Sequence, residues 1–425
     1  MGIKTGYKGY KAYDYLTPGE DYMEFALTSK DRLPEWLVPL TAEQEKRSLR
    51  LAEEKMIISM HEHPVYNPLD LNQYGMQRQR GRSFCAYEGL AESYLDVTFD
   101  NLMNGSCCIT SHNGWKWTDI VHDLGMRLCD VAHQDFLVHV RTADEIEQVR
   151  AQGKIAWVAC IEGAMPIENE LDRIDILYGL GVRLLGLTYS ESNALGSGLK
   201  EDRDSGLTAF GKRAVQRMNK VGMLIDVSHG STLTAIDAAE ISSVPICMSH
   251  TGARKLWNSK RLATDEAIKA VAATGGVVGI EAAPHTTITY NRRTHDIDSV
   301  MEHFEYVVNL IGIDHVCFGT DTNWGDHVGL HNKFAKFLSN SETRNTEEFP
   351  RVEYVKGIEN PRESSKNLLR WLVAHGYSDE DIGKVLGGTV MRVLRAVWKY
   401  DLKAGLKQVG LSGHAPCRKT APTSG

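Results

Sequence analysis

The chain has 425 residues, and its 48 Lys and Arg against 55 Asp and Glu give a formal net charge of −7 at pH 7. A hydrophobic content of 42% and a charged content of 24% are ordinary for a folded globular protein and exclude a disordered chain. The mild negative charge gives no support for a nucleic-acid partner. Because no apolar run is long enough for a membrane span or a secretory signal, we expect a protein that neither crosses a membrane nor is secreted.

Eight short apolar runs recur along the chain, each followed by a polar or glycine-containing loop and then by a segment with helical periodicity. The runs are MIISM (56–60), SCCIT (106–110), IAWVACI (155–161), RLLGLTY (183–189), MLIDVS (223–228), VPICMS (244–249), GVVGIE (276–281) and HVCFGT (315–320). Continuous rather than alternating apolarity is typical of parallel strands buried on both faces. Eight such strands alternating with helices predict an α/β fold, a single (β/α)₈ TIM-like barrel. The rival, an open doubly wound sheet, would gather its key polar residues at one switch point.

We expect this barrel to occupy residues 56–400, with an N-terminal extension over 1–55 and a tail over 401–425. In the extension, TAEQEKRSLRLAEEK (41–55) predicts a surface helix. The helical segment 362–400 is predicted to complete the fold.

Two long connections interrupt the regular alternation, 64–105 after the first strand and 322–360 after the eighth. The first contains several aromatic residues and a cluster formed by Arg78, Arg80 and Arg82. Connections of this length in a compact domain are usually lids or binding walls. A poorly ordered surface is the alternative.

Eight cysteines are a low density for this length, and no Cys-x-x-Cys pair is present. Cys108, Cys160, Cys247 and Cys317 lie in apolar runs and are expected to be small core residues. This usage is typical of a reduced, intracellular protein, and we expect a cytoplasmic location. A cysteine-based zinc site is excluded.

Metal-ligand residue types follow five of the eight runs. They are His61 and His63 after the first, and then Glu162, His229, His250 and Asp321, each after a different strand. In a barrel, the carboxyl ends of the strands form the face on which active sites are assembled. A lone histidine at a strand end is usually structural, but six such residues together favour a catalytic metal site. Imidazoles and carboxylates without thiolates suit Zn²⁺, Mn²⁺ or Fe²⁺.

The spacing within His61-Glu62-His63 supports this prediction. Residues two apart in a strand point the same way, so both imidazoles can face the barrel mouth while Glu62 points away. A helical His-Glu-x-x-His motif is excluded because position 65 is Val. Two metals side by side would need a bridging carboxylate, for which the strand ends offer Glu162 and Asp321.

Four further histidines are not expected to be metal ligands. His112 and His315 are predicted to be structural. His327 and His331 fall in the long connection after Asp321 and are predicted to be solvated loop residues, with substrate contact as the alternative.

Three motifs carry a family resemblance: IEGA (161–164), GLTAFGKRAVQRMNKVGMLIDVSH (206–229) and SHTGARKLWNSKR (249–261). FGTD (318–321) is a weaker fourth. Through them the chain, from about Ile57 to Val397, resembles the membrane (renal) dipeptidase family of the amidohydrolase superfamily.

The resemblance implies a metal-dependent hydrolase, most simply a binuclear zinc enzyme acting on a dipeptide or another small amide. It implies His61, His63 and Asp321 as ligands of one metal, Glu162 as the bridge, and His229 and His250 as ligands of the second. Asp321 would also transfer protons, and Arg261 would hold a substrate carboxylate. For Arg261, a surface charge is the alternative. A homodimer is also implied.

Two departures from the family pattern touch the reacting centre. The family has His-x-Asp where this chain has His61-Glu62-His63, so a neutral ligand replaces an anionic one and the net charge of the site rises. Tyr189, in LTYSESN (187–193), stands where the family has a histidine. A tyrosine hydroxyl can donate a hydrogen bond to an oxyanion but carries no positive charge.

The primary hypothesis is therefore hydrolysis of an amide or other C–N bond in a small molecule. Two metals would activate the water, Asp321 would be the proton shuttle, and Tyr189 would face the oxyanion. One alternative is a barrel with a single metal that acts as a lyase or decarboxylase. The other is a non-catalytic relative that acts as a binding protein.

Overall fold

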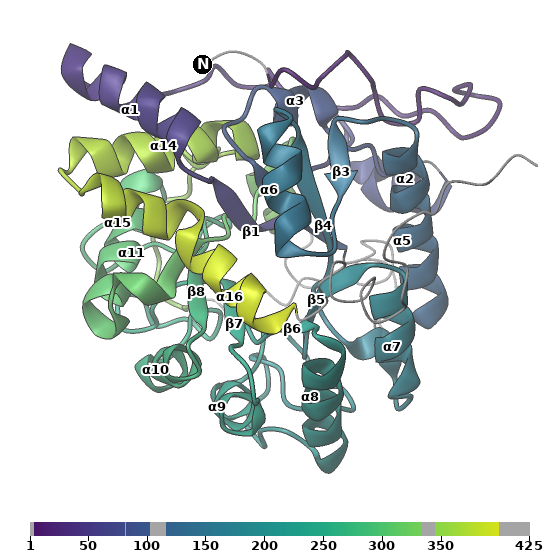
Figure 1. Ribbon diagram of the computed structural model, residues 1–425, viewed down its shortest axis with the longest axis vertical. Helices are drawn as coiled ribbons and strands as arrows, with labels where there is room; N and C mark the ends of the chain where they lie inside the picture. The colour runs from purple at the N-terminus through teal and green to yellow at the C-terminus, as the bar shows by residue number, and fades with distance from the viewer. Residues whose placement is uncertain (1–3, 81, 103–115, 334–344, 399–425) are drawn as a thin grey trace, which may run out of the picture.

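Eight parallel strands form the wall of an almost closed barrel in the computed structural model of the chain (Figure 1). The structure describes residues 4–80, 82–102, 116–333 and 345–398. In their hydrogen-bonded order the strands are β1 (Ile58–Glu62), β2 (Val97–Leu102), β4 (Ile155–Ile161), β5 (Val182–Gly186), β6 (Leu224–Asp226), β7 (Cys247–Thr251), β8 (Val277–Ile280) and β9 (Val316–Phe318). A ninth short strand, β3 (Leu137–His139), pairs with the first residues of β4. The predicted (β/α)₈ fold is confirmed.

The first and last strands of the barrel meet through the residues that follow β9. The Asp321 N–H donates to the His61 carbonyl at 2.9 Å, and the His63 N–H donates to the Thr322 carbonyl at 2.9 Å. The buried Glu62 carboxylate accepts hydrogen bonds from the Thr322 N–H at 2.9 Å and from the Thr322 hydroxyl at 2.7 Å. Glu62 thus points away from the mouth, as predicted. Its hydrogen bonds join β1 to the turn after β9, at a junction that we call the seam of the barrel.

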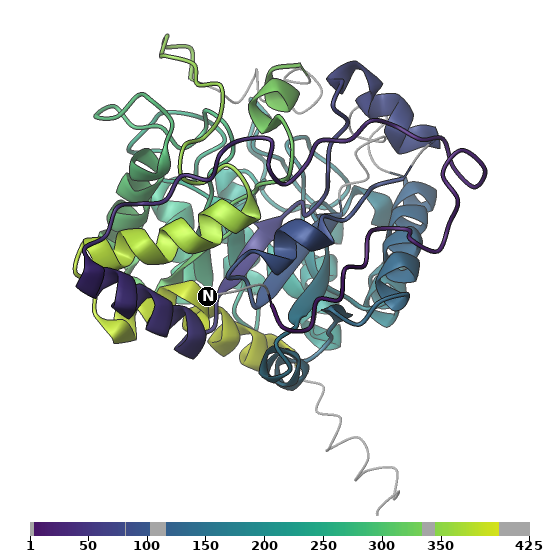
Figure 2. The ribbon, with the colours of Figure 1, turned by 90° about the horizontal axis from the view of Figure 1, so that it is seen from above.

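Helices cover the outside of the barrel (Figures 1 and 2). The helices between consecutive strands are α2 (Tyr74–Arg80), α3 (Tyr87–Ala91), α5 (Trp117–Ala132), α6 (Ala143–Ala151), α7 (Asp172–Gly179), α8 (Ala209–Val221), α9 (Thr232–Ile241), α10 (Asp265–Ala273) and α11 (Ile297–Ile311), with the 3₁₀ turns η1 (Leu71–Gln73), η2 (Met165–Ile167) and η3 (Ile313–His315). Several begin at a Ser or Thr whose hydroxyl accepts a backbone N–H of the first turn; Thr208 at α8 and Ser231 at α9 are examples. Such caps satisfy donors that the helix itself leaves free.

The remaining helices lie at the two ends of the described chain. They are α1 (Ala42–Glu54) before the barrel, and α12 (His327–Lys333), α14 (Pro361–Ala374), α15 (Asp379–Gly383), the π-helical turn η4 (Lys384–Gly388) and α16 (Thr389–Val397) after it. The helices predicted over 41–55 and 362–400 are therefore confirmed. Figure 2 shows the N-terminal segment running across the surface before α1. The predicted tail, 401–425, lies outside the described residues.

The second strand differs from the prediction. It is β2 (Val97–Leu102), which pairs with β1 and β4 and lies within the segment predicted to be a long loop. Apolar and polar side chains alternate over the first four residues of its sequence, VTFDNL. The Asp100 carboxylate accepts a hydrogen bond from the Trp157 indole N–H at 2.9 Å and forms an ion pair with Arg127. A strand with buried polar partners lacks the continuous apolarity that marked the other seven. The predicted run 106–110, with Cys108, lies outside the described residues.

Apolar side chains fill the interior of the barrel below its mouth. They include Met60, Phe99, Val158 and the three buried cysteines Cys160, Cys247 and Cys317, and α16 packs against them with Val393 and Leu394 among its residues. The predicted role of these three cysteines as core residues is confirmed. Because this layer is apolar, the polar groups of the barrel are concentrated at the carboxyl ends of the strands. No helix among the described residues is long and apolar enough to cross a membrane.

His303 on α11 is a buried histidine that does not line the described pocket, and it sets a testable pH dependence. Its Nδ1 accepts the Ala253 N–H at 2.9 Å, its Nε2 donates to the Ile288 carbonyl at 3.0 Å, and burial lowers its pKa from 6.5 to about 4. The unfolded chain therefore binds a proton that the folded chain refuses. This contribution to stability is present above about pH 6.5 and is lost as the pH falls towards 4.

We expect His303→Gln to be less stable than the parent at pH 7.5, with a difference that shrinks by about 1.4 kcal/mol per pH unit as the pH falls between 6.5 and 4. Urea unfolding of both proteins at several pH values measures the difference and cancels the titration of all other groups. A difference that stays constant with pH would contradict the assignment.

Candidate active site

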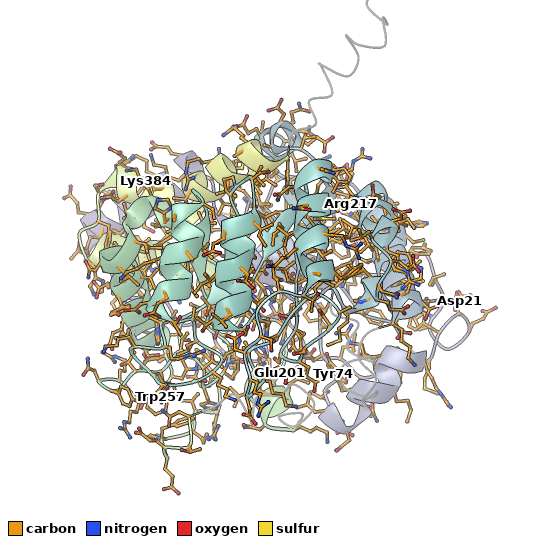
Figure 3. All side chains as sticks on the ribbon, turned by 90° about the horizontal axis from the view of Figure 1, so that it is seen from below. Asp21, Tyr74, Glu201, Arg217, Trp257 and Lys384 are labelled. Atoms are coloured by element: carbon orange, nitrogen blue, oxygen red, sulfur yellow. The ribbon has the colours of Figure 1, made fainter. Side chains whose placement is uncertain are left out.

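All six predicted metal ligands meet at the mouth of the barrel, where the strands end. In Figure 3, Tyr74 and Glu201 lie towards this loop end, whereas Arg217 and Lys384 lie towards the opposite end. The pairing of β1 with β2 shifts register between Ser59 and Glu62. Such a shift interrupts the alternation that places Met60 in the interior, and it leaves the imidazoles of both His61 and His63 at the mouth.

One half of the site is formed by the two histidines of the first strand with Asp321. The His61 Nε2 lies 3.5 Å from the Asp321 Oδ1, and the His63 Nε2 lies 3.2 Å from the same oxygen. Asp321 directly follows the turn after β9 and has a positive φ of 54°. A non-glycine residue in the left-handed region is strained, and such strain is typical of functional sites.

The other half is formed by His229 after β6 and His250 in β7. Their Nε2 atoms lie 3.1 Å apart, and both face Glu162. The Glu162 Oε1 is 3.0 Å from the His229 Nε2, 3.4 Å from the His250 Nε2 and 3.7 Å from the His61 Nε2. The Glu162 Oε2 lies 4.0 Å from the His63 Nε2. Glu162 therefore lies between the two pairs of histidines, as the prediction of a bridging carboxylate requires.

The donor atoms of these residues fit metal ions. Three overlapping groups have donor atoms within 4.8 Å of one another: His61, His63 and Glu162; His61, His250 and Asp321; and Glu162, His229 and His250. The His61 Nε2 and the Glu162 Oε2 are buried and have no hydrogen-bond partner among the described residues. Buried polar atoms without partners are costly, and ligation of a cation would satisfy them.

The protonation states of three of the four histidines also suit ligation. Burial lowers the pKa of His61 to about 3 and that of His229 to about 4, and it holds the pKa of His250 well below its usual value. These imidazoles are neutral near pH 7 and keep a lone pair for a metal. Burial also acts on His63, but the hydrogen bond and charge of Asp321 outweigh it and raise its pKa to about 9.

A carboxylate behind the histidines orients them. The buried Asp226 of β6 accepts the Ser249 hydroxyl at 2.5 Å and the Ser249 N–H at 2.9 Å. The Ser249 hydroxyl oxygen lies 2.8 Å from the His250 Nδ1 and 3.4 Å from the His61 Nδ1. One side chain thus contacts the Nδ1 atoms of two candidate ligands and leaves their Nε2 atoms facing the mouth, as supporting residues do at metal sites.

Arg261 lies in the wall of the pocket and is only 5% exposed, so the alternative of a surface charge is wrong. It forms an ion pair with the buried Glu281, which follows β8, and it donates to the His250 carbonyl at 3.3 Å. Burial raises the pKa of Glu281 to about 7, although the nearby Arg261 charge opposes this. Glu281 was not predicted as a site residue, although it is the last residue of the GVVGIE run and therefore lies at the carboxyl end of a strand, as the candidate metal ligands do.

Tyr189 also lines the pocket. Its ring stacks on the His229 imidazole with centroids 4.4 Å apart and an angle of 24° between the planes. The side chain that replaces the family's histidine is therefore next to a candidate metal ligand.

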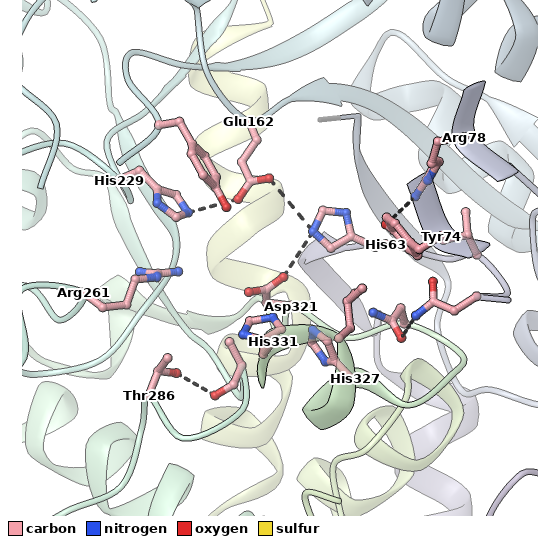
Figure 4. A pocket seen from close by; sticks show the side chains of 16 residues that line it. His63, Tyr74, Arg78, Glu162, His229, Arg261, Thr286, Asp321, His327 and His331 are labelled. Atoms are coloured by element: carbon pink, nitrogen blue, oxygen red, sulfur yellow. Dashed lines mark hydrogen bonds and ion pairs between the residues drawn. The ribbon is translucent and has the colours of Figure 1, made fainter. Parts of the chain in front are cut away.

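Most of the rest of the pocket comes from the two long connections, as predicted for binding walls. These connections contribute Asn67, Tyr74, Arg78, Asn323, His327 and His331 to the lining, and the loop after β8 adds Thr286 (Figure 4). His327 is 3% exposed, so its prediction as a solvated residue is wrong, whereas His331 is partly exposed and lines the same wall. They belong to α12, which folds back over the mouth. His315 is structural, with its Nδ1 2.8 Å from the Gly276 carbonyl oxygen. His112 lies outside the described residues.

Comparison with known proteins identifies relatives of this site. A family model described as membrane dipeptidase (Peptidase family M19) matches residues 115–338. An uncharacterized Klebsiella pneumoniae protein in the pqqA 5′ region is 29% identical over 289 residues, which are 66% of this chain and 92% of that protein. The dipeptidase verJ of Clonostachys rogersoniana is 28% identical over 299 residues, or 69% of this chain and 66% of its own length. The chain thus spans just under two thirds of that fungal enzyme.

Solved structures share the fold. An amidohydrolase from Pseudomonas aeruginosa superimposes with a TM-score of 0.66 at 24% identity, covering 83% of this chain and 99% of that one. A metallopeptidase from Rhodobacter sphaeroides, solved with a phosphinate mimic of the dipeptide L-Ala-D-Ala, gives a TM-score of 0.61 at 19% identity, covering 81% and 99%. At these identities the likeness concerns the arrangement of the chain.

Proposed function

The chain belongs to the membrane dipeptidase family, whose members are metal-dependent hydrolases, and from this premise we propose that it hydrolyses an amide bond of a small molecule with two zinc ions. The position of Glu162 carries the proposal. Its two oxygens reach imidazoles of both histidine pairs, at 3.0 Å for His229 and 4.0 Å for His63. A carboxylate shared in this way supports two cations side by side rather than one.

In this proposal His61, His63 and Asp321 hold one metal, His229 and His250 hold the other, and Glu162 bridges them. When bound, such cations supply Lewis acidity, which lowers the pKa of a water molecule and polarises a carbonyl group.

The chain's own groups would complete the reaction. The hydrogen bond from His63 and the neighbouring imidazoles outweigh burial and hold the pKa of Asp321 well below its usual value. An ionised Asp321 can accept the proton of the attacking water and return it to the leaving nitrogen. The Tyr189 hydroxyl would donate a hydrogen bond to the oxygen that gains negative charge, and Arg261 would bind the carboxylate of the leaving amino acid.

The two departures from the family widen the substrate class. His63 removes one negative charge from the reacting centre, and Tyr189 supplies a neutral donor. We therefore propose dipeptides, N-acyl amino acids and cyclic amides together as the candidate substrates. The homodimer and the cytoplasmic location stay predictions from the sequence.

The proposal is tested by elemental analysis of the purified protein, followed by a hydrolysis screen over these three substrate classes. We expect about two zinc equivalents per chain and turnover of at least one class. A chelator should abolish the activity, and added Zn²⁺, Mn²⁺ or Fe²⁺ should restore it. About one equivalent with no hydrolysis would contradict the proposal in favour of a lyase. No bound metal and no turnover would favour a binding protein.

A further inference from the structure

Two arginines lie on opposite sides of the candidate metal ligands. In Figure 4, Arg261 is on one side of the group formed by Glu162, His63 and Asp321, and Arg78 is on the other. Both line the same pocket. The leaving amino acid is assigned to Arg261, so Arg78 faces the part of the pocket left for the acyl side of the scissile bond.

The carboxylates in and near the pocket already have partners or proposed roles. Its described lining contains two carboxylates, Glu162 and Asp321, and both are candidate metal ligands. Glu281 is engaged with Arg261. The described wall therefore offers no further carboxylate to a substrate ammonium group, such as the free amine of a dipeptide.

Arg78, in contrast, has guanidinium N–H donors that form no hydrogen bond with the described residues. The half-buried guanidinium donates from Nη1 to the Ser83 hydroxyl at 2.7 Å and from Nη2 to the Tyr74 hydroxyl at 3.1 Å, and it lies 5.2 Å from the centre of the Tyr74 ring. Its Nε is buried without a hydrogen-bond partner among the described residues, and Asp123 interacts with the guanidinium electrostatically. An arginine has five N–H donors, so those remaining can bind a planar anion at two points.

We propose that the acyl group of the substrate carries its own carboxylate, which Arg78 binds, and has no free amine. This inference rests on the proposed hydrolase function and narrows it to N-(carboxyacyl) amino acids. The reaction breaks the amide C–N bond: the hydroxyl of water joins the carbonyl carbon and a proton joins the leaving nitrogen. The products are a dicarboxylic acid and an amino acid, and no oxidant or further reactant is required.

Because the contacts of Arg78 fix its guanidinium, this residue can select a substrate carboxylate by geometry as well as attract it by charge. Ser83 and Tyr74 hold the guanidinium in one orientation, and the Tyr74 ring lies against it. A guanidinium group held in one orientation recognises a carboxylate better than a mobile surface cation does. A substrate ammonium on the acyl side would instead face the positive charge of Arg78, and Asp123, the carboxylate that interacts electrostatically with Arg78, does not line the pocket.

The test uses matched pairs of amides of D- and L-alanine. Malonyl, succinyl and glutaryl derivatives are compared with propanoyl, butanoyl and pentanoyl derivatives, in which a methyl group replaces the terminal carboxylate. For the best chain length we expect a preference for the diacid of about 10- to 100-fold in kcat/KM, mostly through KM. Arg78→Met should remove the preference, and Arg78→Lys should restore part of it. Arg80→Met, an exposed arginine of the same helix, should leave it unchanged.

The outcomes separate this inference from the proposed function. Turnover without any preference for a diacid, or a preference that survives in folded Arg78→Met, overturns the inference and leaves the hydrolase intact. If no amide is turned over, calorimetric binding of the same pairs to the metal-loaded protein decides. Tighter binding of the diacid that disappears in Arg78→Met supports the anion site, and equal binding of the two acyl types overturns it.

Discussion

The Asp321→Asn variant is expected to keep its bound metal while its kcat falls by roughly 10²- to 10⁴-fold. The amide oxygen can still face His61 and His63, but it cannot take a proton from water and return it to the leaving nitrogen. Asparagine also tolerates the left-handed backbone at this position, where φ is 54°. The substitution therefore changes the chemistry of the side chain with little disturbance of the turn.

Asp314→Asn is the matched control, since Asp314 is exposed near the opposite end of β9. It should retain full activity. Elemental analysis alongside the kinetics separates loss of the proton carrier from loss of the metal. If Asp321→Asn held its metal and kept full activity, Asp321 could not be the proton shuttle.

The second large effect is expected from Glu162→Gln. A neutral amide in place of the bridging carboxylate leaves two cations without the negative charge between them, so metal affinity should fall by at least about 100-fold. We expect the purified variant to contain less than one metal per chain and to lack hydrolytic activity. Equilibrium dialysis against zinc, followed by elemental analysis, measures the affinity directly.

Glu170→Gln provides the comparison, because Glu170 is exposed in the loop that follows Glu162. Its metal content should equal that of the parent protein. Two metals bound with parental affinity in Glu162→Gln would exclude a bridging role for Glu162.

The fold and the positions of the candidate metal ligands could be predicted from the sequence because both depend on a local pattern. A strand buried on both faces has a continuous apolar sequence. The residue that follows this sequence lies at the mouth of the barrel. His229 and Asp321 could be placed in this way without any knowledge of their neighbours. β2 was not predicted because the buried Asp100 is stabilised by distant partners, Trp157 and Arg127, that no local pattern records.

The pocket wall shows the same limit. Arg78 and His327 are far apart in the chain and come together only because their two long connections fold over one mouth. The length of these connections predicted binding walls but did not indicate which side chains face the pocket. Arg261 was assigned by resemblance alone, and its partner Glu281 is evident only once the ends of β7 and β8 lie side by side.

The seam between β1 and the turn after β9 gives the candidate metals a further role. His61 and His63 stand on one side of it and Asp321 on the other, and Glu62 and Thr322, which face each other across it, are 260 positions apart in the chain. Bringing these segments together closes a loop that contains almost the entire barrel, which has a large entropic cost. An ion held by both sides is a reversible cross-link at that closure. Its binding energy would be realised only after the first and last strands have met, so metal loading would stabilise the step that completes the barrel.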